Sequence, residues 1–193
     1  MKNLMKLLCC AFLLVIALGI TGCGGNNAKT AQQEKSNTTV EQPPAKKEMQ
    51  QIEINIAVGS LENGKVPVDV TTNIIDGAEL MIHMGNQFIW REEHGIEENA
   101  QLNEEQVKQI RAETYSGSTK KIVQNGKIHC EFSGDKLAPG TYDITVSMSI
   151  PSLQKDKKVA ELYGRSGEYL AVGPCVKSNI SKHISKTVRI ELQ

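Results

Sequence analysis

The side chains that most often do chemistry are few in this sequence and far apart along it. Histidines stand at four separate positions: His83, His94, His129 and His183. The segment Gly164–Gly167 is one residue short of the Gly-x-Ser-x-Gly turn that carries a hydrolase serine, and it follows no alternating strand. Common metal-ligand and phosphate-loop motifs do not occur after the N-terminal segment. We therefore expect no catalytic residue, no metal site and no cofactor.

Acidic side chains gather around His94, and their oxygens are candidate ligands of a cation. The glutamates are Glu92, Glu93, Glu97, Glu98, Glu104 and Glu105. Calcium loops place their acids at defined positions around a turn glycine, and this segment lacks that order. A solvated acidic loop is the better interpretation. Trp90, in the same segment, is expected in or against the core rather than exposed as a ligand platform.

The N-terminal residues have the organisation of an export signal. Lys2 and Lys6 make the start positive, and Leu7 to Ile20 is an uninterrupted uncharged run. That run is too short for a comfortable spanning helix, which needs roughly 20 apolar residues. It fits the apolar region of a signal peptide, so residues 1–22 are predicted to be removed.

Ile20-Thr21-Gly22-Cys23 follows this run and resembles the bacterial lipobox. Ile20 departs from the leucine that the family most often has there. The resemblance implies that Cys23 receives a diacylglyceryl group and becomes the first residue of a lipoprotein on the extracytoplasmic face of the cell membrane. Its partner is then the lipid bilayer itself. An uncleaved anchor or an ordinary secreted protein is the alternative.

Composition after residue 22 excludes some partners and divides the chain. Removing two lysines leaves 20 basic and 22 acidic residues, a formal charge of −2 with no basic stripe for nucleic acid. Residues 23–50 are rich in Asn, Gln, Lys and Thr and offer little to bury, so they are predicted to be a flexible tether. Residues 51–193 are long enough for one domain with a core.

Two cysteines, Cys130 and Cys175, remain in that domain. An exported protein permits disulfides without requiring them, so a Cys130–Cys175 bond and two inert thiols are both open. Neither is expected to be catalytic, because a reactive thiolate needs a positive, partly exposed setting.

Alternation of apolar and polar residues dominates after residue 50 and predicts antiparallel strands with one face packed and one wet. The alternating runs are Ile52–Val58, Val66–Val70, Leu80–Met84, Ile128–Phe132, Tyr142–Ile150 and Val188–Leu192. Asn125-Gly126 is a type I′ hairpin signal that places Val123 opposite Ile128. At Asn63-Gly64 a simple hairpin would pair Val58 with Asp69. Either a bulge near Gly59 corrects that register, or these strands are not partners.

Leu137-Ala138-Pro139-Gly140-Thr141-Tyr142 precedes the longest alternating run. It resembles the corner before the F strand of fibronectin type III and immunoglobulin-like domains. The resemblance implies that Tyr142 is the structural corner tyrosine, whose hydroxyl bonds back across the connection. The predicted fold is all-β: an immunoglobulin-like antiparallel β-sandwich of about seven strands with a long insertion before the last one. A small β-barrel is the alternative.

Two segments exceed what such a scaffold needs: residues 85–105 and 151–186. Asn103 and Gln106 could form a capping box for a short helix carrying Val107 and Ile110. A connection as long as 151–186 tends to carry function or structure of its own. If the domain has a binding surface, these segments are the expected place.

The sequence therefore favours a non-enzymatic binding module held at the cell envelope, with an unidentified envelope protein or polymer as its partner. The rival is a hydrolase, which would need His94, two glutamates and Asp156 to cluster. A purely structural spacer is the third possibility, and it would present no sizeable pocket or apolar patch.

Overall fold

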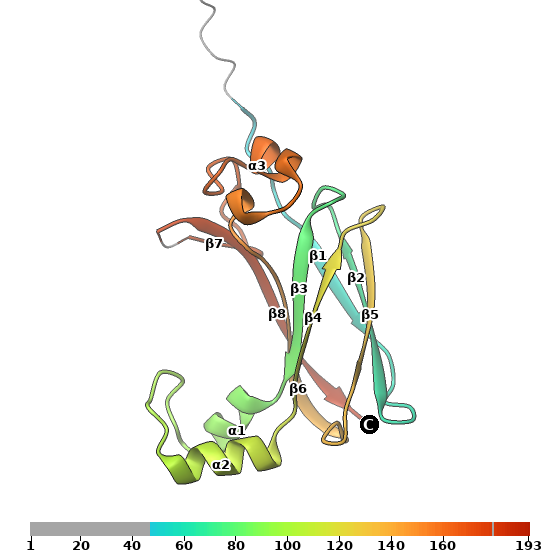
Figure 1. Ribbon diagram of the computed structural model, residues 1–193, viewed down its shortest axis with the longest axis vertical. Helices are drawn as coiled ribbons and strands as arrows, with labels where there is room; N and C mark the ends of the chain where they lie inside the picture. The colour runs from blue at the N-terminus through green and yellow to red at the C-terminus, as the bar shows by residue number, and fades with distance from the viewer. Residues whose placement is uncertain (1–46, 179) are drawn as a thin grey trace, which may run out of the picture. The chain divides into compact units, whose positions relative to one another are not determined.

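The computed structural model describes residues 47–178 and 180–193 (Figure 1). The predicted signal peptide, Cys23 and the tether as far as residue 46 lie outside the described residues. The elements, in chain order, are β1 (Ile54–Val58), β2 (Lys65–Thr72), β3 (Glu79–Gly85), α1 (Gln87–Glu93), α2 (Glu104–Glu113), β4 (Ser116–Ile122), β5 (Lys127–Ser133), β6 (Gly140–Met148), the 3₁₀ helix η1 (Pro151–Leu153), α3 (Lys157–Tyr163), β7 (Val176–Ser178) and β8 (Lys182–Leu192).

The strands form two antiparallel sheets. One has the order β1-β2-β5 and the other β4-β3-β6-β8-β7. The described chain thus has eight strands where the sequence indicated about seven, and a few short helices. No closed barrel forms among residues 47–178 and 180–193, so the barrel alternative is wrong.

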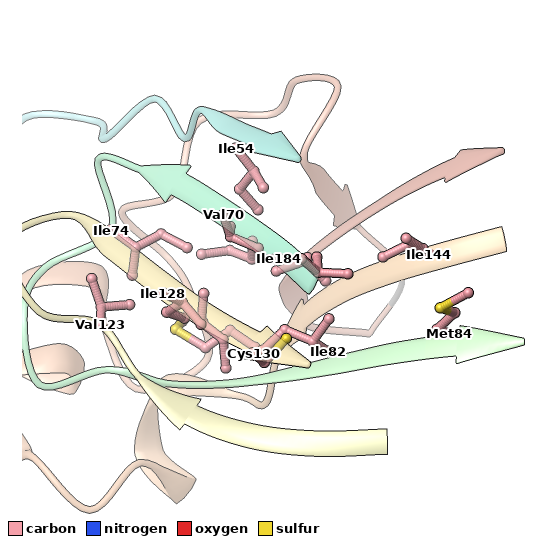
Figure 2. Packing of buried hydrophobic residues seen from close by; sticks show 14 of the residues in the cluster. Ile54, Val70, Ile74, Ile82, Met84, Val123, Ile128, Cys130, Ile144 and Ile184 are labelled. Carbon is pink, nitrogen blue, oxygen red and sulfur yellow. The ribbon is translucent and has the colours of Figure 1, made fainter. Parts of the chain in front are cut away.

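One hydrophobic core lies between the sheets, and the alternating residues build it as predicted. Val66, Val68 and Val70 of β2 are essentially inaccessible, as are Leu80 and Ile82 of β3. Figure 2 shows the inward side chains of both sheets converging on this core. Strict alternation places every second residue of β5 and β6 in it as well.

The strands on either side of the Asn63-Gly64 turn are partners, and a bulge next to the turn corrects their register, the first of the two alternatives. Asn63 and Gly64 both have positive φ, and Glu62 bridges Lys65. Three residues of one strand then face two of the other, so that Val58 pairs with Val68 and Ile56 with Val70. The Gly59 amide donates to the Pro67 carbonyl at 2.9 Å inside the bulge. The extra residue returns both strands' valines and isoleucines to the same face.

The Asn125-Gly126 turn forms, but the strands beside it separate. Both residues have positive φ, as a type I′ turn requires, and the Asp76 carboxylate accepts from both of their amides. Beyond the Gln124–Lys127 bridge, however, β4 pairs with β3 and β5 pairs with β2. The predicted pairing of Val123 with Ile128 is therefore wrong. Val123 instead exchanges backbone bonds with Gly77 and Ala78, because β4 continues beside the residues that precede β3, and its side chain is buried there.

The last strand begins at Lys182, six residues before the alternating pattern, and pairs with β6 from Ile184 to Leu192. Lys186 occupies an inward position, which hides the pattern in the sequence. Its ammonium group donates to the Ile54 carbonyl at the free edge of β1. The long insertion is therefore shorter than predicted and contains η1, α3 and β7.

Helix α2 begins with the predicted capping box. The Asn103 side chain accepts from the Gln106 amide at 2.8 Å, and the Gln106 side chain accepts from the Asn103 amide at 3.0 Å. Ile110 is buried. Of the helices in the described part of the chain, none has the length and apolar character needed to cross a bilayer.

Candidate functional site

The outward face of the five-stranded sheet carries a cluster of polar side chains around His83 and Thr145, the polar floor. Strand register aligns His83 with Ser118 on one side and Thr145 on the other, and Thr145 with Thr187. The His83 Nδ1 atom lies 2.9 Å from the Ser118 hydroxyl, and the two threonine hydroxyls are 2.9 Å apart. Neighbouring strands in an antiparallel sheet bring such side chains together without any helix or loop.

Helix α1 covers one end of this floor and makes a pocket with it. The cavity has a volume of about 260 Å³. Its floor comes from β3, β6 and β8, and its wall from the segment that follows β3. The residues that line it are His83, Gly85, Gln87, Phe88, Arg91, Glu92, Ile96, Glu98, Asp143, Thr145 and Thr187. Phe88 is about half exposed at this pocket. The pocket therefore combines hydrogen-bonding groups with one accessible aromatic ring.

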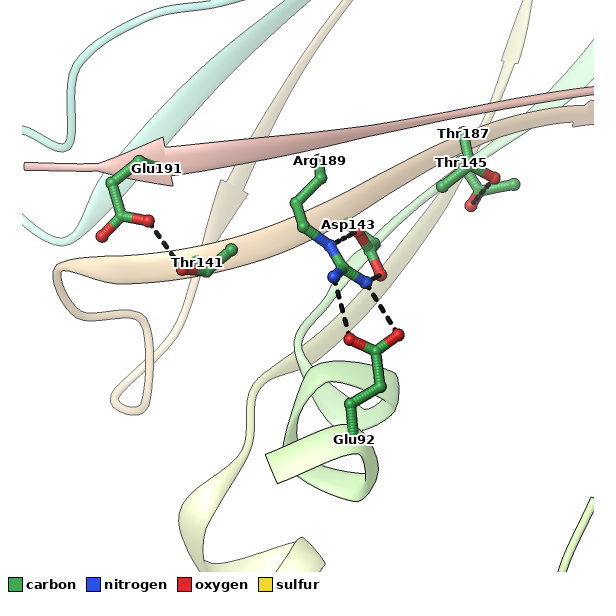
Figure 3. Close-up of polar contacts among 7 residues, drawn as sticks. All are labelled: Glu92, Thr141, Asp143, Thr145, Thr187, Arg189 and Glu191. Carbon is green, nitrogen blue, oxygen red and sulfur yellow. Dashed lines mark hydrogen bonds and ion pairs between the residues drawn. The ribbon is translucent and has the colours of Figure 1, made fainter. Parts of the chain in front are cut away.

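Arg189 joins the wall of the pocket to its floor (Figure 3). Its guanidinium group donates two hydrogen bonds to Asp143 on the adjacent strand, at 2.9 and 3.0 Å. It donates two more to Glu92 of α1, at 2.9 and 3.2 Å. These hydrogen bonds, those to Asp143 first and then those to Glu92, raise the pKa of Arg189 above its ordinary value. The planar fork of arginine suits two carboxylates at once, so this residue bridges α1 to the sheet.

The segment from Asn86 to Tyr115 is otherwise held by its own contacts. The Asn86 side chain accepts from the Tyr115 amide at 2.8 Å, which closes the base of the excursion. The buried Trp90 donates its indole N–H to Glu113 at 2.7 Å, linking α1 to α2. Arg91 donates to the carbonyls of residues 97, 98 and 100 and thereby fixes the loop between the helices.

A second pocket, of about 500 Å³, lies at the other end of the same sheet face. Its floor includes the exposed Met81, and Ile150 and Leu153 of the long insertion form a side. Glu79 lies at its edge between Lys155 at 3.0 Å and Lys120 at 3.3 Å. The hydrogen bond from Lys155, and then that from Lys120, lowers the pKa of the Glu79 carboxyl. Both segments that exceed the scaffold thus line pockets on one face.

The histidine and glutamates of residues 92–105 do not assemble into a metal centre. His94 ends α1 with its ring stacked on Trp90 at 3.9 Å and its Nδ1 atom 2.7 Å from the Trp90 carbonyl. Asp156 caps α3, in the other insertion, where its carboxylate accepts from the Lys158 amide. Within the described ranges, no group of three or more His, Cys, Asp or Glu side chains could hold a metal ion.

Cys130 and Cys175 are both buried and both free thiols in the structure. Burial is the main cause that raises the pKa of the Cys130 thiol, which keeps it protonated at neutral pH. The hydroxyl of Tyr142 donates to the Ala138 carbonyl at 2.9 Å and accepts from the Ala138 amide at 3.3 Å. Tyr142 thus ties the connection between β5 and β6 to the start of β6.

The residues that sequence reasoning missed are those of the sheet floor. Asp143, Thr145, Thr187 and Arg189 read as ordinary polar positions of two strands. The register Tyr142 with Ile190 would have paired Asp143 with Arg189, but the long insertion between these strands leaves that register unspecified by any turn. Family models, curated proteins and solved structures were compared with the chain, and none matches it.

Proposed function

We propose that this chain is a lipoprotein, anchored outside the cytoplasm through lipid on Cys23, whose folded part is a non-enzymatic binding module of the cell envelope. The anchor is supported by the positive start, the apolar run and the lipobox-like Ile20–Cys23. Acyl chains on one cysteine give durable attachment because each buried methylene contributes about 0.8 kcal/mol.

We further propose that the folded part is an immunoglobulin-like β-sandwich. Its order of three strands, β1-β2-β5, facing β4-β3-β6-β8 is that of fibronectin type III domains, with β7 as an addition. The hydroxyl of Tyr142 bonds to the backbone four residues upstream, as the corner tyrosine of this class does. Domains of this architecture act through loops and exposed faces, so the fold alone names no partner.

The observation that carries the binding role is the pocket beneath α1. The thirty residues between β3 and β4, 86–115, add no strand to either sheet, yet they form the wall of a cavity on the polar floor. Hydroxyls of Thr145 and Thr187, the His83 ring and the Phe88 ring face one space there. Such a mixture suits a partner that offers polar groups beside one apolar group, such as an envelope protein segment or a polymer.

The rival readings have less support. The hydrolase required His94 and Asp156 in one cluster, and these residues belong to different insertions, with His94 stacked on Trp90. A spacer would need no pocket, whereas the outward sheet face has two.

The anchor is tested by expressing the chain with its own signal in a bacterium, as wild type and as Cys23→Ala. We expect the wild type in the membrane fraction with the added mass of lipid, and the variant without either. A soluble wild type of unmodified mass would refute the anchor.

The binding role is tested by photo-crosslinking in intact cells. A photoreactive residue at Phe88, on the pocket, is compared with one at the exposed Ala57, on β1 of the other sheet. A defined adduct from position 88 that is absent from position 57 is the expected result. Identical adducts from both, or none from position 88, would contradict a binding role for this pocket.

A further inference from the structure

The end of the domain that carries η1, α3 and β7 exposes apolar side chains between lysines. Eight large hydrophobic side chains are exposed in the described residues, and five of them belong to residues 47–52 or 150–186. These are Met49, Leu153, Leu162, Val172 and Ile180. Leu153 and Val172 are each 72% exposed and Ile180 completely so. Exposed apolar groups gathered at one end of a domain are typical of a surface that contacts a partner or a membrane.

The charge of this end is positive. Residues 150–185, which exclude the inward Lys186, contain six Lys or Arg and three acids, a formal charge of +3, whereas residues 85–113 contain three and seven, a charge of −4. Lys157, Lys158, Arg165 and Lys177 are exposed. Their side chains form no hydrogen bond or salt bridge to other described residues, so they are available to an external anion.

The first described residues, 47–50, lie at this same end of the domain (Figure 1). Lys47 donates to the Glu161 carbonyl at 2.8 Å and lies over the Tyr169 ring at 4.8 Å. Gln50 pairs in parallel with Leu170, through bonds to the backbone of residues 169 and 171. The first described residues of the chain are therefore bound to the α3 side of the domain.

We propose that the η1–α3–β7 surface docks on a bilayer that contains anionic phospholipid. Its lysines contact the headgroup phosphates, and Leu153, Leu162 and Val172 enter the interface beside them. Lys158 and Leu162 lie one helical turn apart on α3, so one face of that helix presents both kinds of contact. The inference rests on the proposed function for its biological setting, because the lipid on Cys23 would bring this end to the membrane.

Docking through the η1–α3–β7 surface would also set which end of the domain faces away from the membrane. β3 starts at Glu79, beside Gln154 and Lys155, and ends at Gly85, next to α1. Its seven residues separate the two ends by about 20 Å. The pocket beneath α1 and its acidic surroundings then point away from the membrane, where a partner can reach them.

The test is cosedimentation with vesicles of the mature chain, residues 23–193, carrying Cys23→Ala so that no lipid is attached. We expect binding to phosphatidylcholine vesicles that contain phosphatidylglycerol, and much weaker binding to phosphatidylcholine alone. Replacing Lys157 and Lys158 with alanine should weaken binding about fivefold per lysine, or about 30-fold together. The matched control replaces Lys108 and Arg111, exposed basic residues of α2, and should leave binding unchanged.

A fluorescence measurement reports which end touches lipid. Trp90 is the only tryptophan, and it is buried in α1 at the far end, so the emission of the parent chain should not respond to vesicles. Leu162→Trp should add emission that shifts to the blue with phosphatidylglycerol present. An unshifted Leu162→Trp spectrum in a chain that sediments would overturn the proposed surface.

Absence of binding to anionic vesicles, or an equal loss of binding in the α2 control, would also overturn the proposed membrane surface. The exposed lysines would then be assigned to an acidic protein partner. These results are independent of the anchor, since the tested chain has no lipid. Failure of lipidation in cells would instead be seen as an unmodified mass of the wild type.

Discussion

The two insertions of this domain are attached to it in different ways. Val159, Tyr163 and Leu170 of the second insertion belong to the main hydrophobic core, and the Tyr163 hydroxyl accepts from the Ile75 amide at 2.9 Å. Ile89, Trp90 and Ile110 of the first are buried, but lie outside that core. Tyr115, at the end of the first insertion, packs in the main core, and the helices α1 and α2 before it are joined to the sheets by a polar contact, that of Arg189 with Glu92.

One scaffold can therefore carry two kinds of surface. An end that shares the core is as stable as the sheets and can hold a fixed orientation. An end with its own small core can open or shift without unfolding the sheets, as a binding wall often must. We expect the α3 end to behave as part of the scaffold and the α1–α2 end as a separate unit.

The strongest test of this comparison truncates one large aromatic in each insertion. Tyr163→Ala should lower the free energy of unfolding by about 3–5 kcal/mol, because it empties a fully buried site of the main core and removes the bond to Ile75. Trp90→Ala should instead release α1 and α2 while amide protection in the sheets persists. Urea unfolding with hydrogen exchange distinguishes the two. If Trp90→Ala lowers protection in β3 and β6 as much as Tyr163→Ala does, the first insertion is not a separate unit.

A smaller effect is expected from the cap of α2. Asn103→Ala removes the acceptor for the Gln106 amide and should destabilise the helix by about 1 kcal/mol. Faster exchange should be limited to residues near 104–113, since this helix belongs to the separable unit. Asn103→Ser keeps a capping oxygen and serves as the control. Faster exchange spread through β4 and β3 would show that α2 is coupled to the sheet.

Much of the scaffold could be predicted from the sequence, because alternation and turn signals agree with the fold there. Alternation predicted the inward valines of β2. The register conflict between Val58 and Asp69 predicted either a bulge or a different pairing, and the structure has the bulge. The strand β4 was not predicted, because Ser116–Ile122 has no apolar alternation. It is an edge strand held by its pairing with β3, and pairing leaves no pattern in composition.

The candidate site was less legible for a related reason. Its floor consists of wet-face residues, and its wall is a seven-residue helix with two buried side chains. These residues form a site only because β6 and β8 pair in one register and α1 lies over them, and neither fact can be predicted from a local sequence pattern. Segments 85–105 and 151–186 were nevertheless identified as excess, which gave the location of the pockets without their chemistry.

The contact between Arg189 and Glu92 allows a more delicate test of the first insertion. Arg189→Gln should accelerate exchange in α1 alone, because it removes the charged bridge from β8 to the helix. The difference in α1 exchange between the variant and the wild type should become smaller at high salt, since salt screens the exposed ion pair of the wild type. Hydrogen exchange at low and high ionic strength measures it. Lys65→Gln, which breaks the exposed pair with Glu131 on the other sheet, is the matched control and should leave α1 unchanged.

The smallest effect concerns Glu79, at the basic end. Lys155 and then Lys120 lower the pKa of its carboxyl in the folded chain. A lowered folded-state pKa means that the ionised carboxylate adds stability above its unfolded pKa, near 4.3. That stability is lost as pH falls through the folded value. Glu79→Gln should therefore be slightly less stable than the wild type at neutral pH, and the difference should vanish in acid.

Glu93→Gln removes a carboxylate from the acidic end of the domain and is compared with Glu79→Gln at the basic end. Glu93 is exposed in α1, among the seven acids of residues 85–113, and no basic side chain in the described residues pairs with it. Removing its charge relieves repulsion, so the variant should equal or slightly exceed the wild type at neutral pH. Urea titrations at neutral and acidic pH compare the two variants. If both lose the same stability at neutral pH, the charge difference between the two ends has no consequence for folding, and only its role in binding remains.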